Sequence, residues 1–317
     1  MSGIDIIKGL PALKKPFPKT VLTIGNFDGV HIGHQKIMRE VARKAGQLGG
    51  TPMAMSFDPH PVKVFSPESP LRLLTPVEEK ARLMAAQGIK KLLLVNFNRE
   101  FARLEPEDFV RRVLVEKISP VHVIVGHNYT FGRAKKGDTK LLRKLGRKYG
   151  FGLHVVRHAM AKGQVVSSSR IRALLERGRV SEAAGMLGRA YMIEGTVEMG
   201  AGRGASLLGF PTANIRTPHE LIPREGVYVV KALVKGKLRD AVLNIGRNPT
   251  FGGNALACEV HIMDFKADLL GSQLSVYFVE RLRSEETFAS VQALKEAIGK
   301  DIEAARRILA LRKTVIV

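Results

Sequence analysis

Two histidines, His31 and His34, lie three residues apart, just after an apolar segment and a loop that contains two glycines. If a helix begins near His31, both imidazoles lie on one face of its first turn. A helix N-terminus offers unpaired N–H groups and partial positive charge to a phosphate, and Gly33 would let that ligand approach the backbone. The spacing therefore predicts that both histidines stabilise charge on phosphorus. The alternative is that they are surface or capping residues.

The sequence VSSSRIRALL offers a second group that suits an anion. Ser167, Ser168 and Ser169 precede Arg170 at the start of another predicted helix. Hydroxyls, helical N–H groups and a guanidinium together can hold a diphosphate. The pattern predicts an anion site, although serines at such a position also cap helices without any ligand.

Residues 256–263, LACEVHIM, alternate as a strand with two different faces. Glu259 and His261 share one face, and solvent exposure is the usual reason for such polarity. If that face lines the mouth of a barrel, Glu259 could accept a proton from a hydroxyl that attacks a phosphate. The predicted faces are Leu256, Cys258, Val260 and Ile262 on one side, and Ala257, Glu259, His261 and Met263 on the other.

These candidate residues lie in two regions of the chain for which the sequence predicts different folds. In the first half, apolar segments at residues 21–24, 52–57, 91–95, 121–125 and 153–156 alternate with helical patterns. Such strands predict a parallel sheet covered on both faces, with ligands bound beyond the carboxyl ends of its strands. The loop that leaves the first of these segments is therefore the expected nucleotide site.

After residue 187 the sequence pattern changes to predicted β segments separated by Gly- and Pro-rich turns. This pattern predicts a small antiparallel barrel, closed by a helix over about residues 286–311. We therefore expect two domains, residues 1–187 and 188–317. In the second, Thr212 and Asn214 offer oxygen ligands that suit Mg²⁺ beside nucleotide phosphates, although the same residues after Gly-Phe-Pro also suit a turn.

The composition of the chain narrows the classes of molecule that it could bind. The chain has 317 residues, 51 basic against 29 acidic, for a net charge of +22. The densest basic stretch, residues 133–148, is interpreted as a solvated helix face because aromatic residues for base stacking are scarce. No run of 18 apolar residues occurs, and a single cysteine fits a reducing compartment. We expect a cytoplasmic protein that binds neither nucleic acid nor membrane, and the absence of a Walker motif excludes P-loop chemistry.

Short motifs in order along the chain resemble the bacterial bifunctional riboflavin kinase/FAD synthetase family. The first half carries TIGNFDGVHIGH, FDPHP, GHNYTFG, KKGD and SSSRIR. The second half carries GFPTANI, GVY, NIGRNPTF and EVHIMDF. The resemblance covers nearly the whole chain. It implies a Rossmann-like nucleotidyltransferase domain with an HxGH loop, followed by an all-β riboflavin kinase barrel with a C-terminal helix.

The resemblance also implies two reactions that use Mg²⁺ and ATP. The C-terminal module would phosphorylate riboflavin to FMN, and the N-terminal FMN adenylyltransferase module would convert FMN to FAD and pyrophosphate. By resemblance His31, His34 and Glu259 are catalytic, Glu259 being the base, and Thr212 and Asn214 are metal ligands. The nucleotide-binding residues would be Gly25, Asn26, Phe27, Asp28, Gly33, Asn128, Ser167, Ser168, Ser169, Arg170, Gly209 and Pro211. The flavin-binding residues would be Asp58, Pro59, His60, Pro61 and Asn244.

Two alternatives stay open, an enzyme that keeps one activity and a basic RNA-binding protein on a degenerate nucleotidyltransferase fold. The HIGH tetrapeptide also occurs in class I aminoacyl-tRNA synthetases, but the chain lacks their Lys-Met-Ser-Lys-Ser loop and has no room for an anticodon domain. Three positions depart from the family pattern. Ala205 and Ser206 stand where an arginine beside glycine is usual, and Leu270 stands where tyrosine is common.

Overall fold

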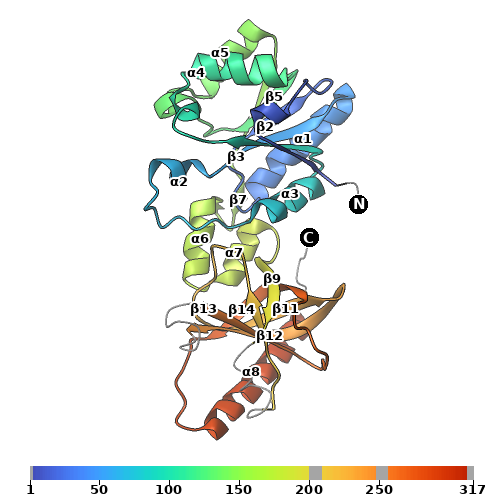
Figure 1. The fold of residues 1–317 in the computed structure, drawn as a ribbon, viewed down its shortest axis with the longest axis vertical. Helices are drawn as coiled ribbons and strands as arrows, with labels where there is room; N and C mark the ends of the chain where they lie inside the picture. The colour runs from blue at the N-terminus through green and yellow to red at the C-terminus, as the bar shows by residue number, and fades with distance from the viewer. Residues whose placement is uncertain (1–2, 200–208, 248–255, 313–317) are drawn as a thin grey trace. The chain divides into compact units, whose positions relative to one another are not determined.

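The computed structural model describes residues 3–199, 209–247 and 256–312. The chain divides into two compact units, Met1–Ser167 and Ser168–Val317, and Figure 1 labels many of their elements. The first unit is an α/β domain, and the second is a β-barrel with helices. The predicted order of the two fold classes is therefore confirmed.

A six-stranded parallel sheet, in the order β1-β4-β3-β2-β5-β6, forms the first unit. Five strands match the predicted apolar segments. The edge strand β1 was not predicted, because its four residues are mostly exposed and two of them are charged. The strands are β1 (Asp5–Lys8), β2 (Val21–Ile24), β3 (Pro52–Asp58), β4 (Lys91–Asn96), β5 (His122–Gly126) and β6 (Gly152–Val156).

Helices cover both faces of this sheet, as continuous apolar strands predict. Met53 and Met55 of β3 pack in one core with helices η3 and α5, whereas Ala54 packs in the other with α1 and α3. The long helices are α1 (Ile32–Leu48), α3 (Val77–Ala86), η3 (Phe109–Ile118) and α5 (Thr139–Tyr149). The short elements are η1 (Leu10–Ala12), α2 (Pro61–Phe65), η2 (Phe101–Arg103), α4 (Pro106–Asp108), η4 (Arg133–Lys135), β7 (Met160–Ala161) and β8 (Gln164–Val165).

The second unit is a closed antiparallel barrel in the order β10-β13-β12-β11-β14-β9. The rings of Tyr228 and Phe278, both almost fully buried, meet edge to face with centroids 5.2 Å apart. The strands are β9 (Met192–Glu198), β10 (Ala213–Arg216), β11 (Gly226–Val234), β12 (Lys237–Arg247), β13 (Leu256–Ile262) and β14 (Gln273–Arg283).

The C-terminal helix α8 (Val291–Leu311) packs against the outside of the barrel through Ala305 and Leu309. A bidentate ion pair joins the end of β14 to this helix, since Arg283 donates to both carboxylate oxygens of the buried Asp301 at 2.8–3.2 Å. The helix begins five residues later than predicted because Ser290 is its N-cap. In the described parts of the chain, no helix is both long and apolar enough to span a membrane.

Two helices that follow the sheet in the sequence, α6 (Ser168–Glu176) and α7 (Val180–Leu187), belong to the second unit. Helix α7 contacts β14, and the backbone N–H of Arg224 donates to the carbonyl of Leu175 at 3.1 Å. The structural division thus lies one helical hairpin before the predicted boundary at residue 187, because these helices pack on the barrel.

Candidate active sites

The loop between β2 and α1 is held in an unusual backbone conformation. Phe27 and Val30 have positive φ angles of 49° and 38°, which bulky residues adopt only under constraint. The buried carboxylate of Asp28 supplies that constraint, because it accepts hydrogen bonds from the backbone N–H groups of Leu74 and Thr75 at 3.0–3.3 Å. Asp28, predicted to bind nucleotide, therefore also shapes the loop.

Both predicted histidines lie at the start of α1. His31 is the N-cap, and its Nδ1 accepts the backbone N–H of His34 at 3.3 Å, which in the neutral ring leaves the proton on Nε2. The two rings stack with centroids 3.6 Å apart, and Phe27 meets His34 edge-on. A Cβ at Gly33 would come within 3.2 Å of the His31 ring, so glycine keeps this pair in place.

His34 is neutral at ordinary pH. Burial, then the charges of His31 and Lys80, hold its pKa well below the usual value. Its Nδ1 is buried and has no hydrogen-bond partner among the described residues. A neutral imidazole stacked on another beside the N-terminus of α1 can donate to a phosphate without opposing the positive end of the helix.

Lys80 was missed by the sequence reasoning. It is only 4% exposed on α3, and its pKa is lowered by burial, while Asp28 and Asp58 oppose that shift. The sequence did contain a signal for its burial. Lys80 lies on the same face of the helix as Val77, Ala81 and Met84, which pack toward the core. A buried cation thus lies within electrostatic reach of the ends of β2 and β3.

The predicted flavin-binding residues Asp58, Pro59, His60 and Pro61 lie where β3 ends and α2 begins. The peptide bond between Asp58 and Pro59 is cis, Pro61 is the first residue of α2, and His60 caps that helix by accepting the N–H of Val62 at 3.2 Å. A chain of aromatic contacts starts here and was not predicted. Its rings, with centroids 5.5–6.1 Å apart, are those of Phe57, Phe65, Phe97 and Phe101.

Asn128 follows β5, the strand beside β2, so it lies at the same edge of the sheet as the histidine loop. Its side chain is exposed. The remaining predicted anion ligands are divided between the units. Ser167 ends the first unit, whereas Ser168, Ser169 and Arg170 form the first turn of α6 in the second.

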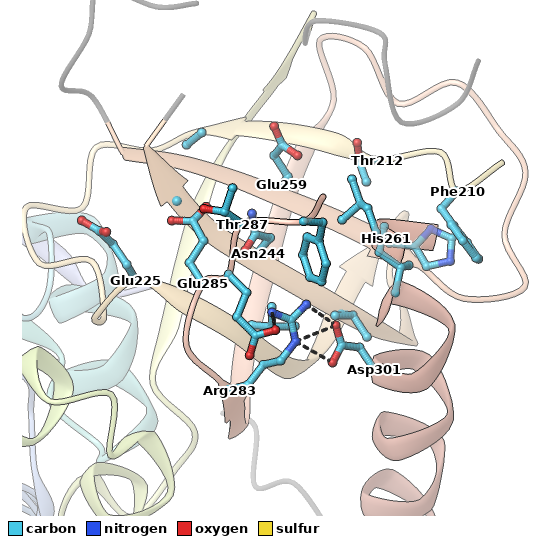
Figure 2. A pocket seen from close by; sticks show the side chains of 18 of the residues that line it. Phe210, Thr212, Glu225, Asn244, Glu259, His261, Arg283, Glu285, Thr287 and Asp301 are labelled. Atoms are coloured by element: carbon cyan, nitrogen blue, oxygen red, sulfur yellow. Dashed lines mark hydrogen bonds and ion pairs between the residues drawn. The ribbon is translucent and has the colours of Figure 1, made fainter. Parts of the chain in front are cut away.

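A cavity of about 1030 Å³ lies between the barrel and the N-terminal part of α8 (Figure 2). Glu259 on β13 has Asn214 of β10 opposite it on one side and Asn244 of β12 on the other. Burial, then the charge of Glu285, raises the pKa of the Glu259 carboxyl. The predicted strand faces are confirmed, since Ala257, Glu259 and His261 line this cavity while Cys258 is buried behind them.

A second barrel cavity of about 450 Å³ has mostly apolar walls. Pro211 and Thr212 line it, and Thr212 also lines the first cavity. A His261 ring nitrogen lies 2.9 Å from the carbonyl of Pro211, so His261 contacts this shared wall. The other residues of the second cavity are Val197, Glu198, Met199, Ala213, Val260, Ile262, Phe265, Lys266, Ala267, Asp268, Leu269 and Leu270.

Four further positions singled out in the sequence belong to the second half of the chain, and two of them are described. Gly209, with a φ of 75°, precedes the shared wall. Leu270, the residue found where tyrosine is common, lines the second cavity and is 53% exposed. Ala205 and Ser206 lie outside the described residues, as does the second half of the NIGRNPTF motif.

Fold and site together define a two-module phosphotransfer enzyme, with a nucleotidyltransferase-type α/β domain and a small barrel that has adjoining cavities. The family model described as FAD synthetase matches residues 13–170, and the one described as riboflavin kinase matches residues 187–309. A relative from Pseudomonas fluorescens is 36% identical over 309 residues, and one from Escherichia coli K12 is 35% identical over 312. The chain belongs to the bifunctional riboflavin kinase/FMN adenylyltransferase family.

These relatives are matched along nearly their whole length. The alignments cover 97% and 98% of this chain, and 98% and 99% of the two relatives, both named bifunctional riboflavin kinase/FMN adenylyltransferase. A crystal structure from Streptococcus pneumoniae, described as a macrolide-efflux protein, has a TM-score of 0.87 at 29% identity and covers 96% of this chain and 98% of that one. The architecture is therefore shared along nearly the entire chain.

Proposed function

We propose that this chain phosphorylates riboflavin to FMN in its barrel and adenylylates FMN to FAD in its α/β domain, with ATP as donor in both steps. The observation that carries the kinase assignment is the wall that Thr212 contributes to both barrel cavities. A nucleotide in the apolar second cavity and an alcohol in the first would meet at this wall.

In the kinase step, Glu259 accepts the proton of the ribityl 5′-hydroxyl as its oxygen attacks the γ-phosphorus of ATP and the bond to ADP breaks. Support comes from its position, partly buried in the first cavity between Asn214 and Asn244. The raised pKa of its carboxyl strengthens it as a proton acceptor. Asn244, which lines the same cavity, orients the flavin chain in this proposal.

The barrel residues also fit Mg²⁺. Thr212 and Asn214 offer a hydroxyl and an amide oxygen beside the Glu259 carboxylate, which are hard oxygen donors of the kind that this ion prefers. Two neutral ligands leave most of the coordination shell to phosphates and water, as is usual for Mg-ATP. When bound, the ion would neutralise charge on the phosphates that Thr212 and Asn214 hold in place.

In the adenylyl step, the FMN phosphate attacks the α-phosphorus of ATP and pyrophosphate leaves. His31, His34 and the N-terminus of α1 stabilise the charge that develops there, and Gly33 lets the phosphate approach. The support is the stacked pair at the helix start, in which His34 is neutral, with Lys80 as a buried cation nearby. Residues 58–61 and the Phe57, Phe65, Phe97 and Phe101 rings suit a planar flavin.

We assign the other predicted nucleotide ligands from the chemistry of their side chains. Asn128 offers an amide at the edge of the sheet, while Ser167, Ser168, Ser169 and Arg170 offer hydroxyls and a guanidinium to the leaving pyrophosphate. Both steps are direct in-line transfers that need positioned charge and no covalent intermediate on the protein. We also propose that residues 1–187 and 188–317 are the functional modules, which the family-model limits support.

The test is to incubate the purified chain with riboflavin and Mg-ATP and to resolve FMN and FAD over time. We expect FMN to appear before FAD, and FAD to form from added FMN without a lag. Formation of only one of the two products would mean that the chain has a single activity. Salt-sensitive RNA binding without flavin turnover would favour the RNA-binding alternative instead, against our proposal of small-molecule substrates in a cytoplasmic setting.

A further inference from the structure

Two histidines that the proposed mechanism does not use are in contact at the carboxyl edge of the parallel sheet. His127 directly follows β5, and His158 follows the neighbouring strand β6. Their ring centroids lie 3.5 Å apart, with the ring planes tilted by 57°. Both side chains are exposed, and neither ring hydrogen-bonds through its nitrogens to a residue that the structure describes. The pair therefore offers two flat rings and their nitrogens to a ligand.

Backbone hydrogen bonds hold this histidine pair in place. The N–H of His127 donates to the carbonyl of Val156 at 3.0 Å, which continues the pairing of the two strands beyond their ends. Ala159, the residue after His158, accepts the N–H of Val166 at 3.1 Å, where the β7–β8 hairpin begins and ends. The sheet and the hairpin thus fix the two backbones, although the side chains themselves are exposed.

The pair lies beside the loop that is proposed to hold the α-phosphate of ATP. A Cβ placed on Gly33 would lie 3.6 Å from the Cβ of Ala159. The segment that carries His158 therefore passes directly against the first turn of α1. A ligand whose phosphate is held at the start of α1 can extend from there to the two rings.

The order of the strands indicates which part of ATP reaches the pair. Strand β2, which leads into the histidine loop, lies between β3 and β5, and the residues proposed to bind flavin follow β3. The other side of β2, where His127 and His158 lie, is left for the adenosine or the pyrophosphate of ATP. Burial, then the charge of His158, lowers the pKa of His127, so this ring brings no positive charge to a pyrophosphate at ordinary pH. Neutral flat rings suit a base, which can stack on them.

We propose that His127 and His158 form the subsite for the adenine base of the ATP that is consumed in FAD formation. This inference rests on the proposed adenylyl transfer. The base stacks on the imidazole pair while the α-phosphate lies at the start of α1. Binding energy from the base, which does not react, then helps to position the α-phosphorus for attack.

The experiment uses the full chain and measures FAD formation from FMN, with ATP varied and with pyrophosphate added as a product inhibitor. His127→Ala and His158→Ala should each raise the KM for ATP by about tenfold, within the usual range for losing a stacking contact with a base. The inhibition constant of pyrophosphate should not change, because pyrophosphate carries no base. The KM for FMN should also stay the same, which shows that the α/β domain remains folded.

His154→Ala is the matched control, since His154 is an exposed histidine on β6 that lies before the carboxyl end of the strand. It should leave the KM for ATP unchanged. An unchanged KM for ATP in both His127→Ala and His158→Ala would overturn the adenine subsite alone. Equal weakening of ATP and pyrophosphate would also overturn it, because the pair would then bind phosphate. If the unmodified chain makes no FAD from FMN, the proposed adenylyl transfer fails, and this inference fails with it.

Discussion

The histidine loop of the sheet and the cavity of the barrel assemble their functional groups in opposite ways. His31, Gly33 and His34 are neighbours in the sequence, and one helix start positions all of them. In the barrel, by contrast, Asn214, Asn244 and Glu259 come from three strands and meet only through their register. A local motif therefore specifies the first site, whereas long-range pairing specifies the second.

This difference determines how each site can fail. The loop depends on a few hydrogen bonds, such as those from Leu74 and Thr75 to Asp28, and backbone groups supply much of its positive potential. The barrel site depends on strand register, because a slip of one residue on β13 would bury Glu259 and turn Cys258 into the cavity. Substitutions should accordingly separate the two activities cleanly.

The largest separation is expected from Glu259→Gln. Losing the proton acceptor should slow FMN formation by about 10² to 10⁴-fold, the usual contribution of a positioned general base. FAD formation from added FMN should remain normal, because the histidine loop is untouched. Assays of both steps on one preparation check this, with Glu286→Gln as control. A variant that kept full kinase activity would remove Glu259 from the mechanism.

His34→Ala should give the reciprocal result. Losing one charge-stabilising donor should cost about 2 to 4 kcal/mol of transition-state stabilisation in FAD formation, while FMN formation persists. His34 is a better target than His31, whose Nδ1 also caps α1. His154→Ala, at an exposed histidine on β6, is the control. Undiminished FAD synthesis in His34→Ala would contradict the assignment.

The boundary between the modules can be tested with two fragments. A fragment of residues 168–317 and one of residues 188–317 should both make FMN but never FAD. The shorter fragment should be less stable by about 2 kcal/mol or more, because it lacks α7, whose Val180 and Leu187 are almost fully buried in the unit. Urea denaturation, monitored by circular dichroism, compares the unfolding free energies of the two fragments. Equal stabilities would show that α6 and α7 do not stabilise the barrel.

The smallest effect concerns pH and the sheet site. The pKa of His34 is depressed in the folded chain, so at acidic pH the unfolded chain binds more protons. Stability should be fully present above the ordinary histidine pKa and should fall as the pH drops below about 6.5, by at most about 1.4 kcal/mol per pH unit. His34→Gln should flatten this dependence in thermal unfolding, whereas His154→Gln should not.

The sequence predicted most of the fold because its patterns are periodic. Apolar strands of the sheet and alternating residues of β13 carry their own register, so both fold classes and the two faces around Glu259 were predicted correctly. It did not predict β1, which has few buried residues, or the packing of α6 and α7 on the barrel. An amphipathic helix shows which face it buries but not which neighbour covers that face.

The prediction of site residues has the same limit as the prediction of the fold. Contiguous residues such as His31 and His34 were paired correctly, and their stacking follows from one helix turn. Lys80 was missed because Asp28 and Asp58, whose charges act on it, lie far from it in the sequence. The hydrogen bonds by which the Asp28 carboxylate holds its loop were not predicted either. Neither fact is available before residues distant in sequence are brought together.

The wall that Thr212 gives to both barrel cavities has a kinetic consequence. If ATP and riboflavin occupy the two cavities as proposed, donor and acceptor can be bound together, and the transferred group crosses only the boundary between the cavities. The kinase step should then proceed through a ternary complex. Initial rates measured against riboflavin at several fixed ATP concentrations should give double-reciprocal lines that intersect, and not the parallel lines of a ping-pong reaction.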